Sequence, residues 1–280
     1  MIDVESLRPR LLHRENDSHK GDYGHLLVVA GCQSMPGAAV LATGAALHSG
    51  CGLVTLHSTD RALQAVVNTF PSAMLSENPG AHFSVLPPAG IDRYDAIAVG
   101  PGLGKAAETR AALIVLLGAA REKSIPAVLD ADALNILSEL PDWQDLVPEG
   151  SILTPHLGEL RRLLPLATDD AVAELCGRTG AVLVMKGWHT RVFTPDGNCL
   201  VNATGNPGLA KGGSGDVLTG LIGGLLARGY SPVDAARLGV WLHGYAGDCL
   251  TRERTAEAWS SRELIDSLHL GFKTLYDENK

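Results

Sequence analysis

Short apolar runs that end in glycine or in polar residues recur along this chain, and they constrain its fold more than any other feature. Residues 26–30 form the first run, residues 95–99 and 127–129 follow, and residues 181–185 form the most aliphatic run of the second half. Continuous apolar runs of this length are typical of strands buried on both faces of a parallel sheet. Because helix-like segments separate them, we predict one doubly wound α/β sandwich.

The composition favours one large core. The chain has 280 residues, of which 45% are hydrophobic, 19% charged and only 5% aromatic. This balance of small aliphatic residues and glycine suits helices packed closely on a sheet. We find no internal repeat, low-complexity tract or linker, so residues 1–280 are predicted to form a single domain.

Charge and cysteine content exclude several classes of partner. The formal net charge of −8 argues against binding to nucleic acid or to a membrane surface. The five cysteines are odd in number and include no CxxC pair, so neither a disulfide framework nor a zinc site is indicated. The start of the chain lacks the features of a secretory signal, and no window reaches about 18 uninterrupted apolar residues. We therefore expect a cytoplasmic protein.

The most informative single segment is the glycine-rich run at residues 205–216, which leads directly into an apolar helix-like stretch. Glycines that open a helix expose its first N–H groups, which then form a concave seat for an anion such as phosphate. Asp216 closes the run, and we interpret it as the acceptor of a proton from a hydroxyl that attacks phosphorus. The alternative is a carboxylate that only stabilises the helix N-terminus.

This run matches neither of two familiar phosphate loops. Lys211 is preceded by Ala210 and followed by glycine, which departs from the P-loop pattern. The segment also lies late in the chain and lacks the acid that follows a dinucleotide fingerprint about 20 residues on. The anion seat is therefore of another kind.

Other strand ends are predicted to face a ligand, because ligands of open α/β sheets lie beyond the carboxyl ends of the strands. The glycine-rich loop 100–104 is one such end, although an ordinary strand-to-helix turn would have the same composition. Asp130 and Asp132 follow the next strand, where they orient Mg²⁺-bound water or substrate hydroxyls, or cap a helix. These alternatives stay open at the level of sequence.

Two further strand ends carry candidate ligand contacts. His156 and Glu159 lie three residues apart, but further metal ligands are not evident, so contact between His156 and a ligand is favoured over a metal site. Lys186 closes the aliphatic strand and is suited to bind phosphate, with Thr190 and backbone N–H groups as further donors. The alternative for Lys186 is a side chain that merely extends from the core to solvent. A turn-linked hairpin at 192–201 then leads into the glycine run.

Taken together, the order and spacing of these motifs resemble those of the NAD(P)H-hydrate dehydratase family. The resemblance covers nearly the whole chain. It is carried by segments 20–24, 36–39, 100–104, 130–134, 154–159, 186–190 and 205–216. One departure lies at His48 and Cys51, where relatives commonly have arginine and alanine.

The resemblance implies a ribokinase-like fold, a three-layer α/β/α sandwich with a mostly parallel central sheet. It also implies a stand-alone, ADP-dependent lyase that repairs the S epimer of hydrated NADH or NADPH. Mg²⁺ would accompany ADP with no metal held by the protein itself, the enzyme would be a homo-oligomer, specifically a homotetramer, and a separate epimerase would be its functional partner. By motif position, the hydrated dinucleotide would contact Ala38, Gly102, His156 and Asp216. The adenine nucleotide would contact Lys186, Gly187, Trp188, His189, Thr190 and Gly215.

The implied chemistry is physically sensible. Hydroxide is a poor leaving group, since bulk water has a pKa of about 15.7, whereas phosphate, with a second pKa of about 6, leaves readily. Phosphorylation of the ring hydroxyl, with Asp216 as base, would therefore make elimination feasible. Two alternatives stay open: a kinase of the same fold for a sugar or vitamin alcohol, and a nucleotide sensor without catalysis.

Overall fold

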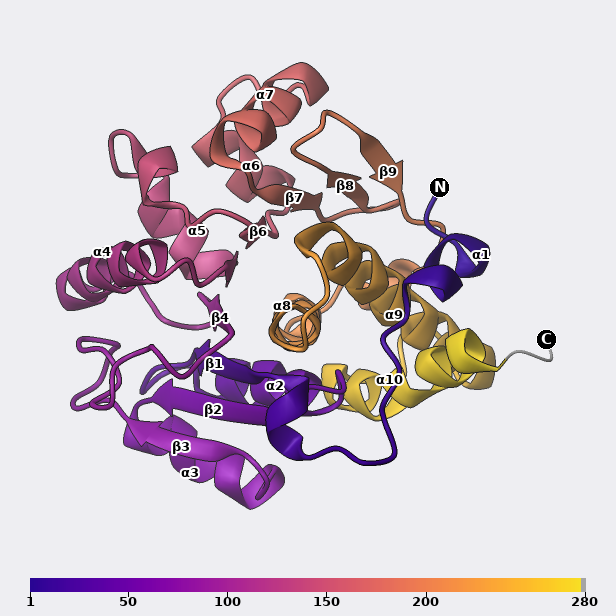
Figure 1. Cartoon of the computed structure of the whole chain (residues 1–280), viewed down its shortest axis with the longest axis horizontal. Helices are drawn as coiled ribbons and strands as arrows, with labels where there is room; N and C mark the ends of the chain where they lie inside the picture. Colours follow the sequence, from indigo (N-terminus) through magenta and orange to yellow (C-terminus); the bar gives the residue numbers. More distant parts are fainter. Residues whose placement is uncertain (278–280) are drawn as a thin grey trace.

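The computed structural model describes residues 1–277 and is built on one nine-stranded sheet (Figure 1). The strand order is β3-β2-β1-β4-β5-β6-β7-β8-β9. In this order, all neighbouring strands from β3 through β2 and β1 to β7 pair in parallel. The pairs β7–β8 and β8–β9 are antiparallel. The strands are β1 (His25–Val29), β2 (Leu53–Ser58), β3 (Met74–Glu77), β4 (Ala96–Val99), β5 (Ala127–Leu129), β6 (Ile152–Leu153), β7 (Val182–Met185), β8 (Arg191–Phe193) and β9 (Cys199–Val201).

The central strands confirm the prediction from the apolar runs. Every residue of β1, β4 and β5 is buried, as expected for strands covered on both faces. The predicted hairpin is also confirmed, since Arg191 pairs with Val201 and Phe193 with Cys199 in antiparallel register. The mostly parallel sheet follows from this pattern.

Helices cover both faces of the sheet and confirm the three-layer α/β/α sandwich. One core lies under α2 (Pro36–Leu47), α3 (Asp60–Thr69), α8 (Ser214–Ala227), α9 (Pro232–Glu253) and α10 (Ser261–Tyr276). The other lies under α4 (Ala107–Glu122), α5 (Ala131–Leu137), α6 (Leu157–Leu163) and α7 (Asp169–Thr179). The short helix α1 (Val4–Leu7) and the 3-10 turns η1 (Arg8–Arg10), η2 (Lys20–Tyr23), η3 (Trp143–Leu146) and η4 (Pro207–Leu209) complete the elements.

Small residues allow α8 to pack directly against α2. A Cβ added at Gly220 would lie 1.9 Å from the carbonyl oxygen of Ala42, and one at Gly224 would lie 2.0 Å from Ser49 Oγ. Any larger side chain at these positions would force the two helices apart. This close contact fixes the position of the N-terminus of α8, where the glycine-rich run ends.

The start of the chain is held by a contact with a distant segment, and the last helix by its own cap. Ile2 forms an isolated bridge with Asn202, and a capping box of Ser260 and Glu263 opens α10. Neither β3 nor α7 was predicted from the sequence. None of the helices within residues 1–277 is both long and apolar enough to cross a membrane.

Candidate active site

The strand order reverses between β1 and β4, which places a crevice beyond their carboxyl ends. The loops after the two strands are joined there, since Gly31 N donates to Pro101 O at 2.7 Å. Gly102, with φ of +63°, approaches the first turn of α2 so closely that a Cβ would lie 2.7 Å from the Ala38 Cβ. The structure therefore brings two predicted substrate contacts, Ala38 and Gly102, side by side.

The glycine-rich run ends at the N-terminus of α8, as predicted. Gly213 adopts a left-handed conformation with φ of +87° at the N-cap position and provides no side-chain cap. Ser214 N donates to Lys211 O at 3.4 Å, whereas the N–H groups of Gly215 and Asp216, next in the first turn, are left for a ligand. A Cβ at Gly213 would lie 2.3 Å from Leu41 of α2, one turn after Ala38. The anion seat thus adjoins the crevice that Ala38 and Gly102 border.

A cavity of about 780 Å³ borders the same helix N-terminus, since Ser214 and Gly215 line it. It brings together all six predicted nucleotide contacts and His156, whereas Ala38, Gly102 and Asp216 are not part of its lining. Its walls consist of His156, the loop Lys186, Gly187, Trp188, His189 and Thr190, residues 202–207 and 209–211, Ser214, Gly215, Leu218, Val240, His243 and Gly244. Asp216 directly follows Gly215, and the charges of Lys186 at the cavity and of Asp132, which holds the 100–104 loop, both act on its carboxylate.

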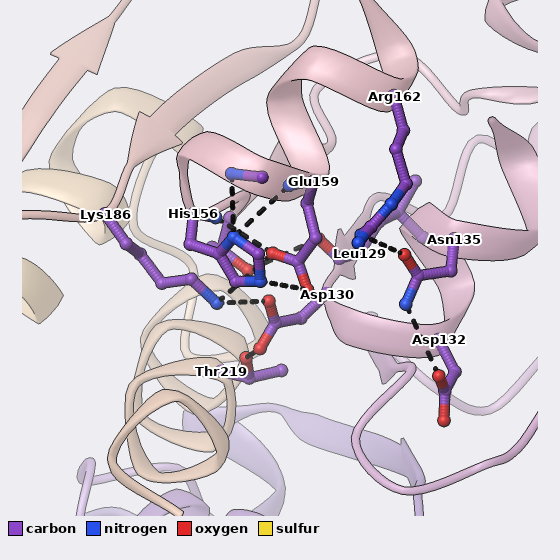
Figure 2. A network of polar contacts seen from close by, with 11 residues as sticks. Leu129, Asp130, Asp132, Asn135, His156, Glu159, Arg162, Lys186 and Thr219 are labelled. Carbon is purple, nitrogen blue, oxygen red and sulfur yellow. Dashed lines mark hydrogen bonds and ion pairs between the residues drawn. The ribbon is translucent and has the colours of Figure 1, made fainter. Parts of the chain in front are cut away.

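Lys186 is held by a buried carboxylate at the edge of the cavity (Figure 2). Its ammonium donates to Asp130 Oδ1 at 2.6 Å, and Thr219 Oγ1 of α8 donates to Asp130 Oδ2 at 2.7 Å. Asp130 is only 1% exposed and the Lys186 side chain 19%. A Cβ at Gly215 would lie 3.4 Å from Lys186 Nζ, so the ammonium lies against the glycine-rich start of α8 instead of extending to solvent.

The two acids after β5 have different structural roles. Asp130 makes no side-chain capping bond to α5, whose first residue, Ala131, has a positive φ of +46°. Asp132 Oδ2 instead accepts from Gly104 N at 2.8 Å and so holds the end of the 100–104 loop. Helix capping is therefore wrong for the Asp130 side chain, and its ion pair with Lys186 was not predicted from the sequence.

His156 caps α6 and also faces the cavity. Its Nδ1 accepts from Gly158 N at 2.9 Å and Glu159 N at 3.2 Å, which leaves Nε2 to carry the proton of the neutral ring. Glu159 Oε2 in turn accepts from His156 N at 2.8 Å, while Glu159 lies 3.9 Å from Lys186 Nζ. Within residues 1–277 no three metal-ligating side chains converge on one point.

The carboxylate of Asp216 lies in an environment that favours its protonated form. Burial, reinforced by the nearby charge of Asp130, raises its pKa to about 6, and Lys186 limits the rise. Asp216 accepts no hydrogen bond from any residue between 1 and 277. A carboxylate whose pKa is raised to about 6 and that accepts no hydrogen bond is suited to act as a general base near neutral pH.

Two residues of α9 complete the site and were assigned no such role from the sequence. His243 is buried in the cavity wall and donates from Nε2 to Ser214 O at 2.9 Å; burial lowers its pKa to about 4, so the ring is neutral. Asp248 accepts from Gly205 N and from Asn206 Nδ2, both at 2.9 Å, and so fixes the start of the glycine-rich run. His243 and Asp248 lie far along the chain from the loops that they contact, and no sequence motif links them to those loops.

Comparison with known proteins is consistent with this geometry. Residues 26–270 match the family model described as NAD(P)H-hydrate dehydratase. The chain belongs to the NAD(P)H-hydrate dehydratase family. A relative from Neisseria meningitidis, named ADP-dependent (S)-NAD(P)H-hydrate dehydratase, is 42% identical over 85% of this chain and 80% of its own length.

Solved structures agree with the family membership. The ADP/ATP-dependent NAD(P)H-hydrate dehydratase of Bacillus subtilis, co-crystallised with ATP and Mg²⁺, is 33% identical, covers 98% of this chain and 97% of its own, and superimposes with a TM-score of 0.82. A ribokinase-like superfamily protein from Enterococcus faecalis is 25% identical, covers 98% of this chain and 95% of its own, and has a TM-score of 0.84. The ribokinase-like fold is therefore confirmed.

The family includes longer proteins. The chain spans about half the length of several curated relatives that it matches, which are named bifunctional NAD(P)H-hydrate repair enzymes. The departure from the family pattern at His48 and Cys51 falls at the C-terminal end of α2, opposite the end that carries Ala38. It therefore lies away from the site described above.

Proposed function

We propose that this chain dehydrates the S epimer of hydrated NADH or NADPH to NADH or NADPH at the expense of ADP, giving AMP and phosphate. The observation that carries the proposal is the position of Asp216 close to two ligand places: it follows Gly215 of the first, and its carboxylate feels the charge of Asp132, which holds the 100–104 loop of the second. One is the cavity lined by residues 186–190, and the other is the crevice bordered by Ala38 and Gly102. The name of the Neisseria meningitidis relative supports this reaction class.

The cavity is suited to the adenine nucleotide. Its volume of about 780 Å³ lies within the range of roughly 300–1,000 Å³ that small-molecule pockets usually have. Lys186 borders the glycine seat and offers a positive charge for the terminal phosphate of ADP. The uncapped N–H groups at the start of α8 would stabilise the phosphoryl group during transfer, because they point at developing negative charge.

Asp216 would accept the proton of the ring hydroxyl as its oxygen attacks the terminal phosphorus of ADP. The bond from this phosphorus to the bridging oxygen then breaks, and AMP leaves. In the second step the lone pair of the ring nitrogen expels phosphate, a proton leaves the neighbouring ring carbon, and the dihydropyridine is restored. The nucleotide is consumed because it converts hydroxide into a better leaving group.

The residues present fit a Mg²⁺ ion carried by the nucleotide phosphates better than an ion held in a protein cage. Mg²⁺ usually keeps several waters and takes one or two carboxylates beside phosphate oxygens. Asp130 is already engaged by Lys186 and Thr219, whereas Glu159 lies beside Lys186 and would hold the ion through water. The ion would neutralise charge on the phosphates.

Several expectations from the sequence stay predictions. They are the single domain over residues 1–280, the homo-oligomeric and specifically homotetrameric assembly, the cytoplasmic location and the functional partnership with a separate NAD(P)H-hydrate epimerase. The bifunctional relatives, whose length is about twice the part matched here, support a coupling of repair activities.

The test is a reconstitution with purified protein, Mg²⁺, ADP and hydrated NADH. The near-ultraviolet absorbance of the dihydronicotinamide ring should return, with one AMP and one phosphate formed for each NADH. Omitting ADP should abolish the signal, and ATP serves as a parallel arm. If no absorbance returns while a panel of sugar and vitamin alcohols yields a stable phosphorylated product, the kinase alternative replaces the proposal. Nucleotide binding without any turnover would favour the sensor.

A further inference from the structure

A second cavity, of about 420 Å³, lies beneath the N-terminal segment. Figure 1 shows this indigo segment passing α10 on its way from α1 to the sheet, and Tyr276 of α10 donates to Leu12 O at 2.7 Å. The cavity is lined by His13, Arg14, His48, Gly50, Arg228, Phe272 and Tyr276. Arg228 follows the last residue of α8, whereas Ser214 begins it, and 14 helical residues span about 21 Å. The cavity is thus far from the candidate active site.

Two guanidinium groups converge on Gly50 at this cavity. Arg14 Nη2 donates to Gly50 O at 2.8 Å, and a Cβ added at Gly50 would lie 2.3 Å from Arg228 Nη1. Within residues 1–277 neither arginine has a carboxylate partner within 4.0 Å, and no acidic residue lines the cavity. Arg228 Nη2 donates to Leu12 O at 2.6 Å, whereas its Nε is buried and has no hydrogen-bond partner.

The helix ends at the cavity offset only part of this positive charge. Helices α2 and α8 both end here, at Leu47 and Ala227. A helix C-terminus carries roughly half a negative charge, so the two ends together offset about one of the two arginine charges. About one positive charge is left in a chain whose formal net charge is −8. Excess charge and unused N–H donors at a cavity indicate an anionic ligand.

We propose that this cavity binds an organic phosphate, with Arg14 and Arg228 on the phosphate group and the rings of Phe272 and Tyr276 against its apolar part. Guanidinium groups match the oxygens of phosphate in pairs, and they do so better than an ammonium. The volume suits a ligand larger than phosphate alone, because it falls in the range of small-molecule sites. The aromatic side chains provide flat apolar faces for a ring.

Phenyl phosphate is a suitable probe, because it combines a phosphate group with an apolar ring and is not a nucleotide. Phenol and inorganic phosphate, which each keep one of these two parts, are its matched controls. In titration calorimetry the wild-type protein should bind phenyl phosphate more tightly than either control. Arg14→Gln should weaken this binding by about tenfold or more, since it removes a charge-assisted contact. Lys186→Ala, which alters the other cavity, should leave it unchanged.

A second measurement on the unmodified protein guards against a folding defect in the variant. The ring-proton NMR signals of His13 and His48 should shift on addition of phenyl phosphate, while the signal of His156 should not. The proposal is overturned if a folded Arg14→Gln protein binds as tightly as wild type, or if Lys186→Ala alone removes the binding. It is equally overturned if inorganic phosphate binds as tightly as phenyl phosphate.

Discussion

Replacing Asp216 by asparagine should make the protein more stable while it removes turnover. The carboxylate accepts no hydrogen bond from residues 1–277, so an amide of the same size loses no contact there. Its pKa is raised to about 6 by burial and by Asp130, from a reference of 3.8. A difference of about two pKa units corresponds to about 3 kcal/mol of unfolding free energy, as an upper bound that solvent screening reduces.

The sign of this effect follows from proton linkage. Between pH 3.8 and about 6 the folded protein holds a proton on Asp216 that the unfolded chain releases, so wild-type stability falls as the pH rises through this window. The asparagine variant lacks this loss. The gain in unfolding free energy of the variant over the wild type should be close to zero below pH 3.8, reach about half of its full size at pH 5, and be nearly constant above pH 7. Urea unfolding at pH 5, 6, 7 and 8 measures the difference.

Catalysis should change in the opposite direction. Loss of a general base commonly costs about 10²–10⁴-fold, so the rate at saturating ADP and hydrated NADH should fall by that factor. In the wild type the rate should fall below pH 6, where Asp216 becomes protonated. Near-native turnover by the variant would refute the role as base, and a loss of stability at every pH would refute the burial argument.

Asp196→Asn is a matched control for the stability measurement. The hydrogen bond from Thr194 Oγ1 lowers the pKa of the exposed Asp196 carboxyl, which is the reverse of the effect on Asp216. Its stabilising contribution is present above the reference value of 3.8 and is lost as the pH falls. The variant should therefore lose a little stability at neutral pH and leave turnover unchanged.

Three further predictions concern the residues around Asp216. Lys186→Ala should raise the dissociation constant of ADP about tenfold or more in titration calorimetry, because a charge-assisted hydrogen bond is worth about 1.5–3 kcal/mol; unchanged affinity would contradict the nucleotide assignment. Asp130→Asn should lower the unfolding free energy by up to about 3–5 kcal/mol, since it leaves the Lys186 ammonium with only the more distant Glu159 carboxylate, and Asp130→Asn combined with Lys186→Met should recover part of the loss. Gly102→Ala should raise the KM for the hydrated dinucleotide more than the KM for ADP, because φ is +63° and the new methyl would lie 2.7 Å from the Ala38 Cβ; an equal change in both would contradict separate places for the two ligands.

Most of the sheet could be predicted from the sequence because the central strands are buried on both faces. Such strands are uniformly apolar, and β1, β4 and β5 were found within one residue of their observed bounds. The strand β3 was missed because it lies at the sheet edge and its residues are mostly exposed, so it carries no apolar run. A continuous apolar run arises only where both faces of a strand are buried, and β3 is mostly exposed.

The place where the glycine-rich run opens α8 was also predictable, because a glycine run that opens a helix has local causes. A left-handed φ at Gly213 and the absence of a side-chain cap follow from glycine at these chain positions. The same holds for the acid that follows it. The role of each loop residue in binding is not tested by the fold, and the predicted contacts of Ala38, Gly102 and His156 with a ligand stay predictions.

The sequence by itself therefore determined the layered α/β architecture and the glycine seat with Asp216, because hydrophobic period and backbone freedom are local properties of the chain. Only the tertiary structure decided the charges that act on that acid. Asp130 precedes Lys186 by 56 residues and Thr219 follows Asp130 by 89, yet the three side chains form one buried network. The parallel order of the sheet brings the ends of β5 and β7 to one edge, where α8 places Thr219, and the interactions between charges depend on that proximity in space.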